Sequence, residues 1–241
     1  MNDTKCLIIT FILISVNHCS FAQPLSSIAI DIGHSLISPG AISARGKPEF
    51  EFNLQLGKAL QQALISHQID AFLIGADGKQ TVLKQRTAKA NADNASFFIS
   101  IHHDSAQSKY LNKWKWQDTE YSYSDDFSGY SLFISRENQH LEKSLVCARM
   151  IGIALKDYGF SSSTHHAEPI SGENRQWADK ESGVYYYDDL VVLKTAKMPA
   201  ILVEAGIIIN RADEENLQKD STRKQIAAAI TQGIENCMTL K

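Results

Sequence analysis

Short apolar runs alternate with segments of helical period along most of this 241-residue chain. Such alternation is typical of a mostly parallel β-sheet, because the crossover between two parallel strands is usually a helix. The expected strands are residues 27–32, 69–74, 97–102, 130–134, 190–193 and 200–204. The expected helices are residues 49–67, 82–94, 137–158 and a last helix opened by Ser221. We therefore predict one α/β domain with a mostly parallel central sheet of about six strands and helices on both faces.

The first 22 residues have the pattern of a secretory signal peptide. Lys5 supplies a positive charge, residues 6–16 are mostly apolar, and small residues stand at Ser20 and Ala22, where a signal peptidase would cut. The apolar run is too short to span a bilayer as a mature helix, and no later apolar run is long enough for a membrane span. A lipid anchor at Cys19 or a buried N-terminal helix fits these residues less well. We expect residues 1–22 to be removed on export and residues 23–241 to form the folded domain.

Charge and cysteine content narrow the remaining classes of function. The formal net charge is -3 and no basic run is present, so we expect no nucleic-acid partner. Cys147 and Cys237 remain after the predicted cleavage, in a compartment that permits disulfides. Cys237 continues the apolar stripe of the last helix, so a buried thiol and a disulfide both fit the sequence.

Histidines and carboxylates stand where separate strands of the predicted sheet end. His34 follows the first strand, the His102-His103 pair ends the third, and Glu204 ends the last. Glu49 and Glu51 open the first helix, where their negative charges could equally interact favourably with the positive end of the helix dipole. Two imidazoles and one carboxylate fill three positions of a catalytic zinc site and leave the fourth to water. Taken together, these residues favour a metal site over separate structural roles.

Five ordered motifs carry a resemblance to a known family. They are residues 30–34 with 38–41, 46–54, 86–91, 98–104, and 199–206 with Asn210 after them. In this order they resemble the zinc-dependent N-acetylmuramoyl-L-alanine amidases of the Amidase_3 type, over residues 27–235. The resemblance implies hydrolysis of the amide bond between N-acetylmuramic acid and L-alanine in peptidoglycan.

The resemblance also implies roles for individual residues. His34, Glu49 and His102 would hold one zinc ion per chain, and Glu204 would be the catalytic carboxylate. These matches select Glu49 over Glu51, and His102 over its neighbour. Strand geometry agrees with the second choice, since adjacent side chains point to opposite faces and only one of the two histidines should reach the metal.

A further motif match points to substrate-binding residues on the second predicted helix. Arg86 and Asn91 match the Arg and Ala-Asn positions of the family. Arg86 would bind a carboxylate of the substrate, or alternatively form a salt bridge on the helix surface.

The chain also departs from the family motifs. Ile32 occupies a position where the family usually has proline. Ser35-Leu36 replace a glycine pair, and Asp104 replaces the usual asparagine. Phe50 and Glu51 replace a Lys-Asp pair. None of these changes removes a predicted ligand.

The connections 104–129 and 160–189 are long for a compact domain, and loops of this length often carry function. The second contains His165 and His166, followed by Glu168 and Glu173. We expect this segment to line the peptide groove or to cover the zinc, with one of the glutamates at the open position. The alternative is a solvated surface loop with two incidental histidines.

Three functions remain to be compared. The leading one is a peptidoglycan amidase exported to the periplasm or cell envelope, where an activator or recruiting protein could localise it. The second is an exported zinc peptidase acting on soluble muropeptides. The third is an inactive or regulatory peptidoglycan-binding protein on an amidase scaffold.

Overall fold

Apolar side chains on both faces of two central strands form the centre of the molecule. In β1 (Ile28–Ile32) all five residues are buried, and β3 (Phe97–Asp104) begins with five buried residues. A strand that is apolar on both faces is typical of a parallel sheet covered by helices on each side. The computed structural model describes residues 27–239, so the signal peptide predicted for residues 1–22 lies outside the described residues.

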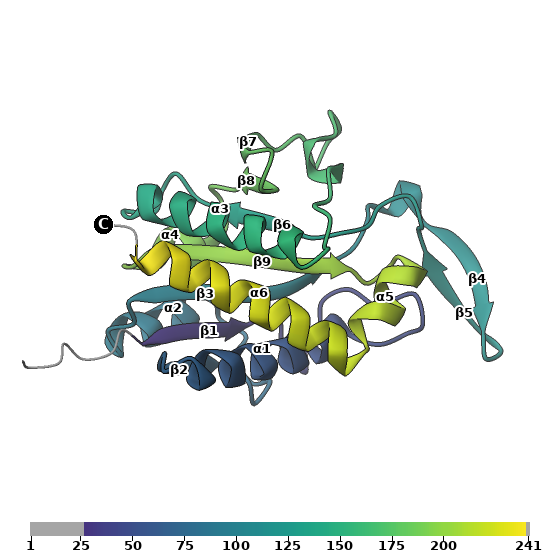
Figure 1. The fold of residues 1–241 in the computed structure, drawn as a ribbon. Coiled ribbons are helices and arrows are strands. Elements are labelled where there is room, and N and C mark those ends of the chain that lie inside the picture. Colours follow the sequence, from purple (N-terminus) through teal and green to yellow (C-terminus); the bar gives the residue numbers. More distant parts are fainter. Residues whose placement is uncertain (1–26, 240–241) are drawn as a thin grey trace, which may run out of the picture.

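The central sheet has seven strands in the order β2-β1-β3-β9-β6-β8-β7 (Figure 1). The strands not yet given are β2 (Ala71–Ile74), β6 (Ser131–Ile134), β7 (Trp177–Asp179), β8 (Val184–Tyr186) and β9 (Ala200–Ile207). Four pairings are parallel, whereas β6 runs antiparallel to β9 and β7 antiparallel to β8. The predicted α/β class and the mostly parallel sheet are confirmed, with seven strands in place of about six.

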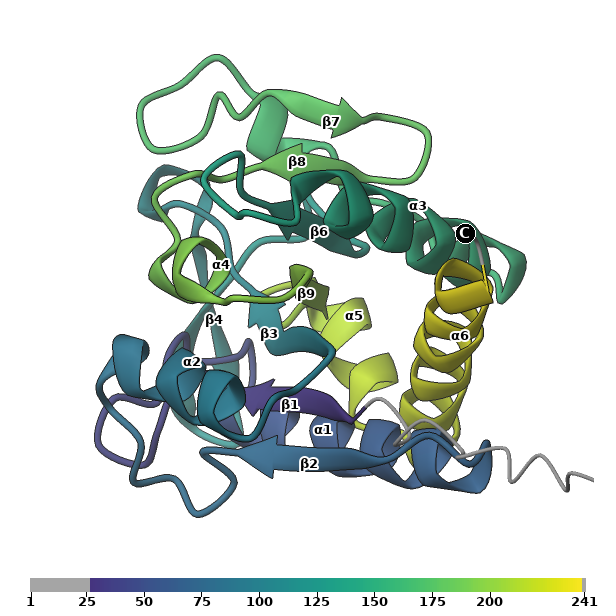
Figure 2. The same cartoon turned by 90° about the vertical axis from the view of Figure 1, so that its left-hand side faces the viewer.

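Helices cover both faces of the sheet, as predicted (Figure 2). One face carries α1 (Glu49–Ser66), α3 (Leu141–Asp157) and α6 (Asp220–Thr239). The other carries α2 (Leu83–Ala92) and α4 (Val191–Thr195), while α5 (Arg211–Leu217) follows β9. Within residues 27–239, no helix combines the length and the apolar character needed to cross a bilayer.

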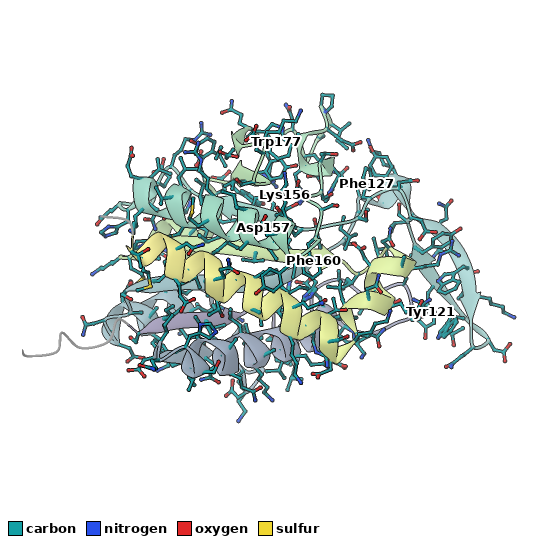
Figure 3. All side chains as sticks on the ribbon, viewed as in Figure 1. Tyr121, Phe127, Lys156, Asp157, Phe160 and Trp177 are labelled. Carbon is teal, nitrogen blue, oxygen red and sulfur yellow. A yellow bond between two sulfur atoms is a disulfide. The ribbon has the colours of Figure 1, made fainter. Side chains whose placement is uncertain are left out.

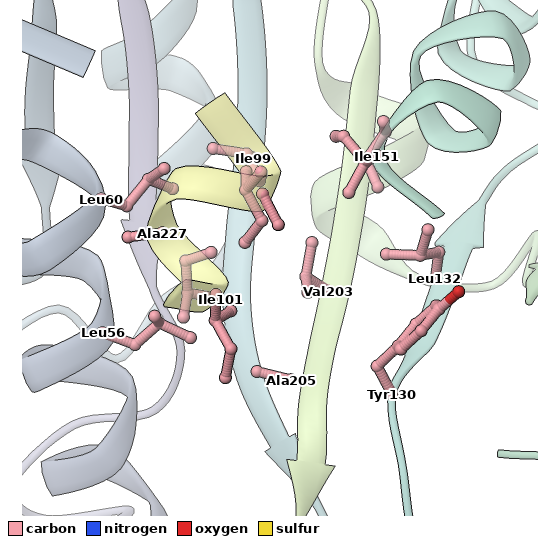
Figure 4. Close-up of a cluster of buried hydrophobic side chains, with 14 of the residues drawn as sticks. Leu56, Leu60, Ile99, Ile101, Tyr130, Leu132, Ile151, Val203, Ala205 and Ala227 are labelled. Atoms are coloured by element: carbon pink, nitrogen blue, oxygen red, sulfur yellow. The ribbon is translucent and has the colours of Figure 1, made fainter. Parts of the chain in front are cut away.

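The larger core lies between the sheet and α1, α3 and α6. In Figure 4, Leu56 and Leu60 of α1 lie on one side of Ile99 and Ile101, and Val203 of β9 lies on the other. All five are buried, and each buried aliphatic side chain of this size contributes about 1.5–3 kcal/mol. This packing fixes the relative positions of β1, β3 and β9.

The strand predicted at residues 190–193 is wrong. Residues Val191–Thr195 form the short helix α4, in which Val192 and Leu193 belong to the same buried apolar cluster as Phe98 of the sheet. Thr195 Oγ1 donates a hydrogen bond to the Val191 carbonyl at 2.7 Å. The β-branched valines favour a strand by local propensity, but burial on the sheet face overrides that preference.

The two long connections contain short strands that were not predicted. Residues 104–129 include a hairpin of β4 (Asn112–Trp116) and β5 (Thr119–Tyr123), which projects from the body, with Tyr121 on it (Figure 3). Its two-residue turn, Gln117-Asp118, has positive φ at both positions. Asparagine and glycine usually mark such a turn, and their absence hid the hairpin in the sequence. Residues 160–189 contain β7 and β8.

A buried ion pair joins α2 to the end of β1. Arg86 Nη1 donates to Asp31 Oδ1 at 2.7 Å, and Ser100 Oγ donates to the other oxygen of Asp31 at 2.7 Å. The same guanidinium donates to the backbone carbonyls of Ile32, His34 and Gln80. Both members of the pair are almost completely buried. The contact fixes the backbone on both sides of Gly33, where β1 gives way to a loop.

A disulfide between Cys147 of α3 and Cys237 of α6 links the two helices on one face. Of the two alternatives that the sequence left open, the disulfide is therefore formed. Its partners are 90 residues apart, so the bond closes a long loop in the unfolded chain.

Replacing both cysteines, Cys147→Ala with Cys237→Ala, should lower the free energy of unfolding by about 2–4 kcal/mol, because the unfolded chain regains the entropy of the open loop. Urea unfolding followed by circular dichroism, with and without reductant, measures the change. Reductant should destabilise the wild-type protein and leave the double variant unaffected. Equal stability of all four samples would contradict a structural role for the bond.

Arg86→Leu should destabilise the protein by about 3–5 kcal/mol, because Asp31 and three carbonyls lose their buried donor. The matched control is Lys89→Ala on the same helix, where the Lys89–Asp93 pair is exposed and should contribute under about 1 kcal/mol. Thermal unfolding of both variants measures the difference. Similar losses of stability in the two variants would show that breaking the buried ion pair costs no more than breaking the exposed one.

Candidate metal and catalytic site

The carboxyl ends of three neighbouring parallel strands bring distant polar residues to one edge of the sheet. His34 follows β1, His102 lies near the end of β3, and Glu204 lies in β9. The Gly33 amide donates to the Ile101 carbonyl at 3.0 Å, and His102 pairs in register with Glu204. This edge is where α/β sheets usually place their sites.

Glu49, the first residue of α1, meets both histidines. His34 Nε2 lies 2.9 Å from Glu49 Oε2, and His102 Nδ1 lies 3.0 Å from Glu49 Oε1. The three ligand atoms all lie within 4.8 Å of one another. We call His34, Glu49 and His102 the first cluster; the structure brings together all three residues that the sequence nominated as ligands.

Two glycines lie against the first cluster, and their lack of side chains leaves room for its ligands. A Cβ on Gly33 would lie 2.4 Å from His102 Nε2, so any side chain there would displace the imidazole. A Cβ on Gly40 would lie 2.3 Å from Glu49 Oε2, and the φ of Gly40, +81°, also disfavours a side chain. His34 itself has a φ of 67°, which is uncommon for a non-glycine residue and is often found at functional sites.

The surroundings of the buried carboxylate in the first cluster favour its ionised form. Burial opposes its charge, but hydrogen bonds with His102 and His34 outweigh burial and hold the pKa of Glu49 well below its usual range. Asn53 Nδ2 and the Ala41 amide also donate to it, each at 3.1 Å. Two imidazole nitrogens and a charged carboxylate oxygen are the donor set of a catalytic zinc site, so the residues present fit such an ion.

His103 and Glu51, the two residues that the sequence did not select as ligands, point away from the first cluster. His103 is buried on the opposite face of β3, where its Nδ1 lies 2.7 Å from Asn53 Oδ1 and its ring packs against Phe52. Burial lowers the pKa of His103 to about 3, so the ring is neutral at pH 7. Glu51 is exposed on α1.

Glu204 differs from every other carboxylate at this edge. Its Oε2 is buried and has no hydrogen-bond partner among the described residues. Burial, followed by the negative charges of Asp104 and Glu49, raises the pKa of Glu204 well above its usual range. A carboxyl group whose pKa is shifted toward neutrality can both accept and release a proton, as general acid–base catalysis requires.

A pocket of about 230 Å³ opens beside His34 and His102, between α2 and α4. Its wall is mainly apolar, with Leu83, Leu190 and Val191 among the lining residues. Pockets with an apolar wall and a few polar groups are typical binding sites for small groups of a ligand.

The residues predicted to bind substrate have partners within the protein. Arg86 lines this pocket, but its guanidinium bonds to Asp31 and the backbone carbonyls described above. Arg86 does form a salt bridge, as the alternative prediction held, but the pair is buried and does not lie on the helix surface. Asn91 joins α2 to the last residue of α4 and to the segment after it, donating to the Thr195 carbonyl at 3.2 Å and accepting from the Lys197 amide at 2.9 Å.

A second group of ligand atoms lies where β3 ends. We call Asp104, His165 and His166 the second cluster, because their ligand atoms also lie within 4.8 Å of one another. The alternative prediction of a solvated loop does not hold for the two histidines, since His165 is 3% exposed and His166 is 7% exposed. The sequence placed Asp104 at a strand end but did not pair it with these histidines. Its position two residues after His102 was the available signal.

The two glutamates predicted to cover the site are held around the second cluster. Glu173 Oε2 lies 2.8 Å from His166 Nδ1, and Glu168 accepts a hydrogen bond from the Tyr110 hydroxyl at 2.6 Å. Among the described residues, neither glutamate is grouped with His34, Glu49 and His102.

Comparisons with known proteins identify relatives of this chain and solved structures of the same fold. The chain is 25% identical over 228 residues to the N-acetylmuramoyl-L-alanine amidase AmiA of Escherichia coli, covering 86% of this chain and 74% of AmiA. The solved amidase Ami1 of Mycobacterium smegmatis superposes with a TM-score of 0.70 at 19% identity, covering 89% and 97% of the two chains. The CwlD amidase of Clostridioides difficile, solved in complex with the GerS lipoprotein, gives a TM-score of 0.63 at 20% identity, covering 90% and 100%.

The family comparison extends over nearly the whole described chain. The model described as N-acetylmuramoyl-L-alanine amidase matches residues 28–236, from β1 to α6, and so includes both clusters and Glu204. The chain belongs to the Amidase_3 family of N-acetylmuramoyl-L-alanine amidases.

Proposed function

We propose that this protein is a zinc-dependent N-acetylmuramoyl-L-alanine amidase that hydrolyses the amide bond between N-acetylmuramic acid and L-alanine in peptidoglycan. The observation that carries the proposal is the convergence of His34, Glu49 and His102 at the sheet edge that also holds Glu204. Family membership supports the substrate class, and the convergence of these side chains supports their proposed roles.

His34, Glu49 and His102 would hold the zinc ion. When bound, zinc polarises a carbonyl and lowers the pKa of water to about 7. The chain holds these ligands in place before any ion binds, because Asn53 and the Ala41 amide orient the Glu49 carboxylate. Gly33 and Gly40 leave the side chains room to converge.

Glu204 would move the proton. Its carboxylate accepts a proton from the attacking water as the water oxygen bonds to the scissile carbonyl carbon. It then delivers that proton to the amide nitrogen as the carbon–nitrogen bond breaks, which leaves a free L-alanine amine and the carboxyl group of the muramic acid. The environment that raises its pKa supports the second of these transfers.

Two other functions fit less well. An inactive wall-binding protein would not need a carboxyl group with a raised pKa beside the ligand set. A zinc peptidase acting on soluble muropeptides uses the same chemistry and differs only in substrate, so the substrate comparison below separates it from the amidase.

Export to the periplasm or cell envelope follows from the substrate and from the predicted signal peptide. Peptidoglycan lies outside the cytoplasmic membrane, so an amidase that acts on it has to cross that membrane. The assembly of CwlD with a lipoprotein supports a similar recruiting or activating partner for this chain.

Glu204→Gln should keep zinc and lose hydrolysis by a factor of about 10²–10⁴, because general acid–base catalysis contributes that much. The assay measures stem peptides released with a free L-alanine amine from intact sacculi and from soluble muropeptides, alongside zinc content. Activity on sacculi supports the amidase, whereas activity confined to soluble fragments supports the peptidase. Undiminished activity of the variant would refute Glu204 as the proton carrier.

His102→Gln should reduce the zinc content by one ion per chain and abolish hydrolysis, since two ligands hold zinc much more weakly than three. His103→Gln is the matched control, because the neighbouring ring is equally part of β3 but bonds to Asn53. This control should keep its zinc while losing stability. Zinc content after gel filtration, measured by mass spectrometry, decides the assignment; loss of zinc in the His103 variant alone would reverse it.

A further inference from the structure

The second cluster has the arrangement of a metal site, independently of the first. His165 and His166 lie in a 3-10 turn, His165–Ala167, and their Nε2 atoms converge on one oxygen of Asp104. Asp104 Oδ2 lies 3.1 Å from His165 Nε2 and 2.8 Å from His166 Nε2. The two rings lie 3.9 Å apart between centroids, and both are buried.

The second nitrogen of each ring is anchored by another residue. His165 Nδ1 lies 2.9 Å from Ser163 Oγ, and His166 Nδ1 lies 2.8 Å from Glu173 Oε2. An imidazole that donates from Nδ1 keeps a lone pair on Nε2. Histidines that bind metals almost always donate their other nitrogen to a carboxylate, carbonyl or similar acceptor. Both rings are therefore oriented as ligands, with Nε2 directed at a common point.

The lack of a hydrogen bond at His165 Nε2 is separate evidence for a bound cation. His165 Nε2 is buried and forms no hydrogen bond with any described residue, although Asp104 lies close by. A buried polar atom without a partner costs about 1–3 kcal/mol. A cation between the three side chains would remove this cost and would use the lone pair that the Ser163 contact leaves free.

We propose that Asp104 Oδ2, His165 Nε2 and His166 Nε2 bind a second divalent cation, Zn²⁺ or one of similar ligand preference. Two imidazoles and one carboxylate suit such ions, whereas Mg²⁺ and Ca²⁺ prefer sites made of oxygen alone. The cation ties residues 165–173 to the end of β3, two residues beyond His102. It thereby fixes the segment 160–189 beside the catalytic edge.

A metal-free ion pair is the competing interpretation of the same contacts. Burial opposes a charge on His166, but Asp104 and Glu173 raise its pKa to about 9, so an unmetallated His166 would be cationic at pH 7. That arrangement satisfies Asp104 and His166 but gives His165 Nε2 only its 3.1 Å contact with Asp104, without a hydrogen bond. The cation satisfies all three side chains, which is why we favour it.

Zinc titration of the metal-stripped protein tests the proposal. The purified protein is treated with chelator, dialysed, and titrated with Zn²⁺ in a calorimeter at pH 7.5, and its zinc content is then measured after gel filtration. The wild-type protein should bind one zinc ion more than His165→Gln or Asp104→Asn. His165→Gln is the more decisive variant. Asp104 lies on the same strand as His102, so Asp104→Asn could also disturb zinc binding by the first cluster.

Two further variants make the result unambiguous. Glu168→Gln lies in the same segment but bonds to Tyr110, so it should bind as much zinc as the wild-type protein. His102→Gln should lose one zinc ion and keep the one held by the second cluster. Circular dichroism in the presence of chelator verifies that each variant is folded.

The outcomes separate this proposal from the proposed function. Loss of one zinc in His165→Gln, with retention in Glu168→Gln, supports the second site. If the wild-type protein binds a single zinc that His102→Gln removes and His165→Gln does not, the second site is overturned while the amidase assignment stands. If instead only the second-cluster variants lose zinc, the ligand assignment of the first cluster fails.

Discussion

The buried Arg86–Asp31 pair is the contact on which the geometry of this protein depends most directly. Asp31 is the last charged residue before β1 ends, and Arg86 reaches it from α2 while also holding the carbonyls of Ile32 and His34. A pair buried this completely adds little net stability, since desolvation opposes the attraction, but breaking it is costly. It therefore specifies one backbone path, and that path gives His34 its uncommon φ and turns its ring toward Glu49.

The parallel sheet explains how two ligand groups arise from so few elements. β3 contributes His102 to the first cluster and Asp104 to the second, and β9 places Glu204 opposite His102. The pairing of β3 with β9 shifts register between His102 and Asp104. Such irregularities are common beside active sites because they redirect side chains. The negative charges of Asp104 and Glu49 both act on Glu204, so the proposed proton carrier lies within the electrostatic influence of both clusters.

Periodicity and motif order predicted the α/β class, the helices on both faces and the edge of the sheet where the polar residues meet, since these depend on burial patterns that the sequence displays. Other features depend on tertiary contacts that it does not display. Val191–Thr195 became a helix because the sheet face could bury its apolar residues. The turn at Gln117-Asp118 lacks the usual residues, and the pairing of Cys147 with Cys237 required two helices to lie side by side. Asp104 and His165 are 61 positions apart, and no periodicity links them.

The partners of Asp104 give a physical reason for an aspartate at a position where the family motif has an asparagine. An asparagine at this position would be neutral and could be buried at modest cost, whereas a carboxylate without partners would be expensive to bury. Burial does oppose the charge of Asp104, but the imidazoles of His165 and His166 beside it hold its pKa below the usual range. The carboxylate on β3 and the paired histidines in the long connection are thus two parts of one arrangement. Each is unfavourable alone, and together they form either an ion pair with one unsatisfied nitrogen or, with a cation, a fully satisfied site.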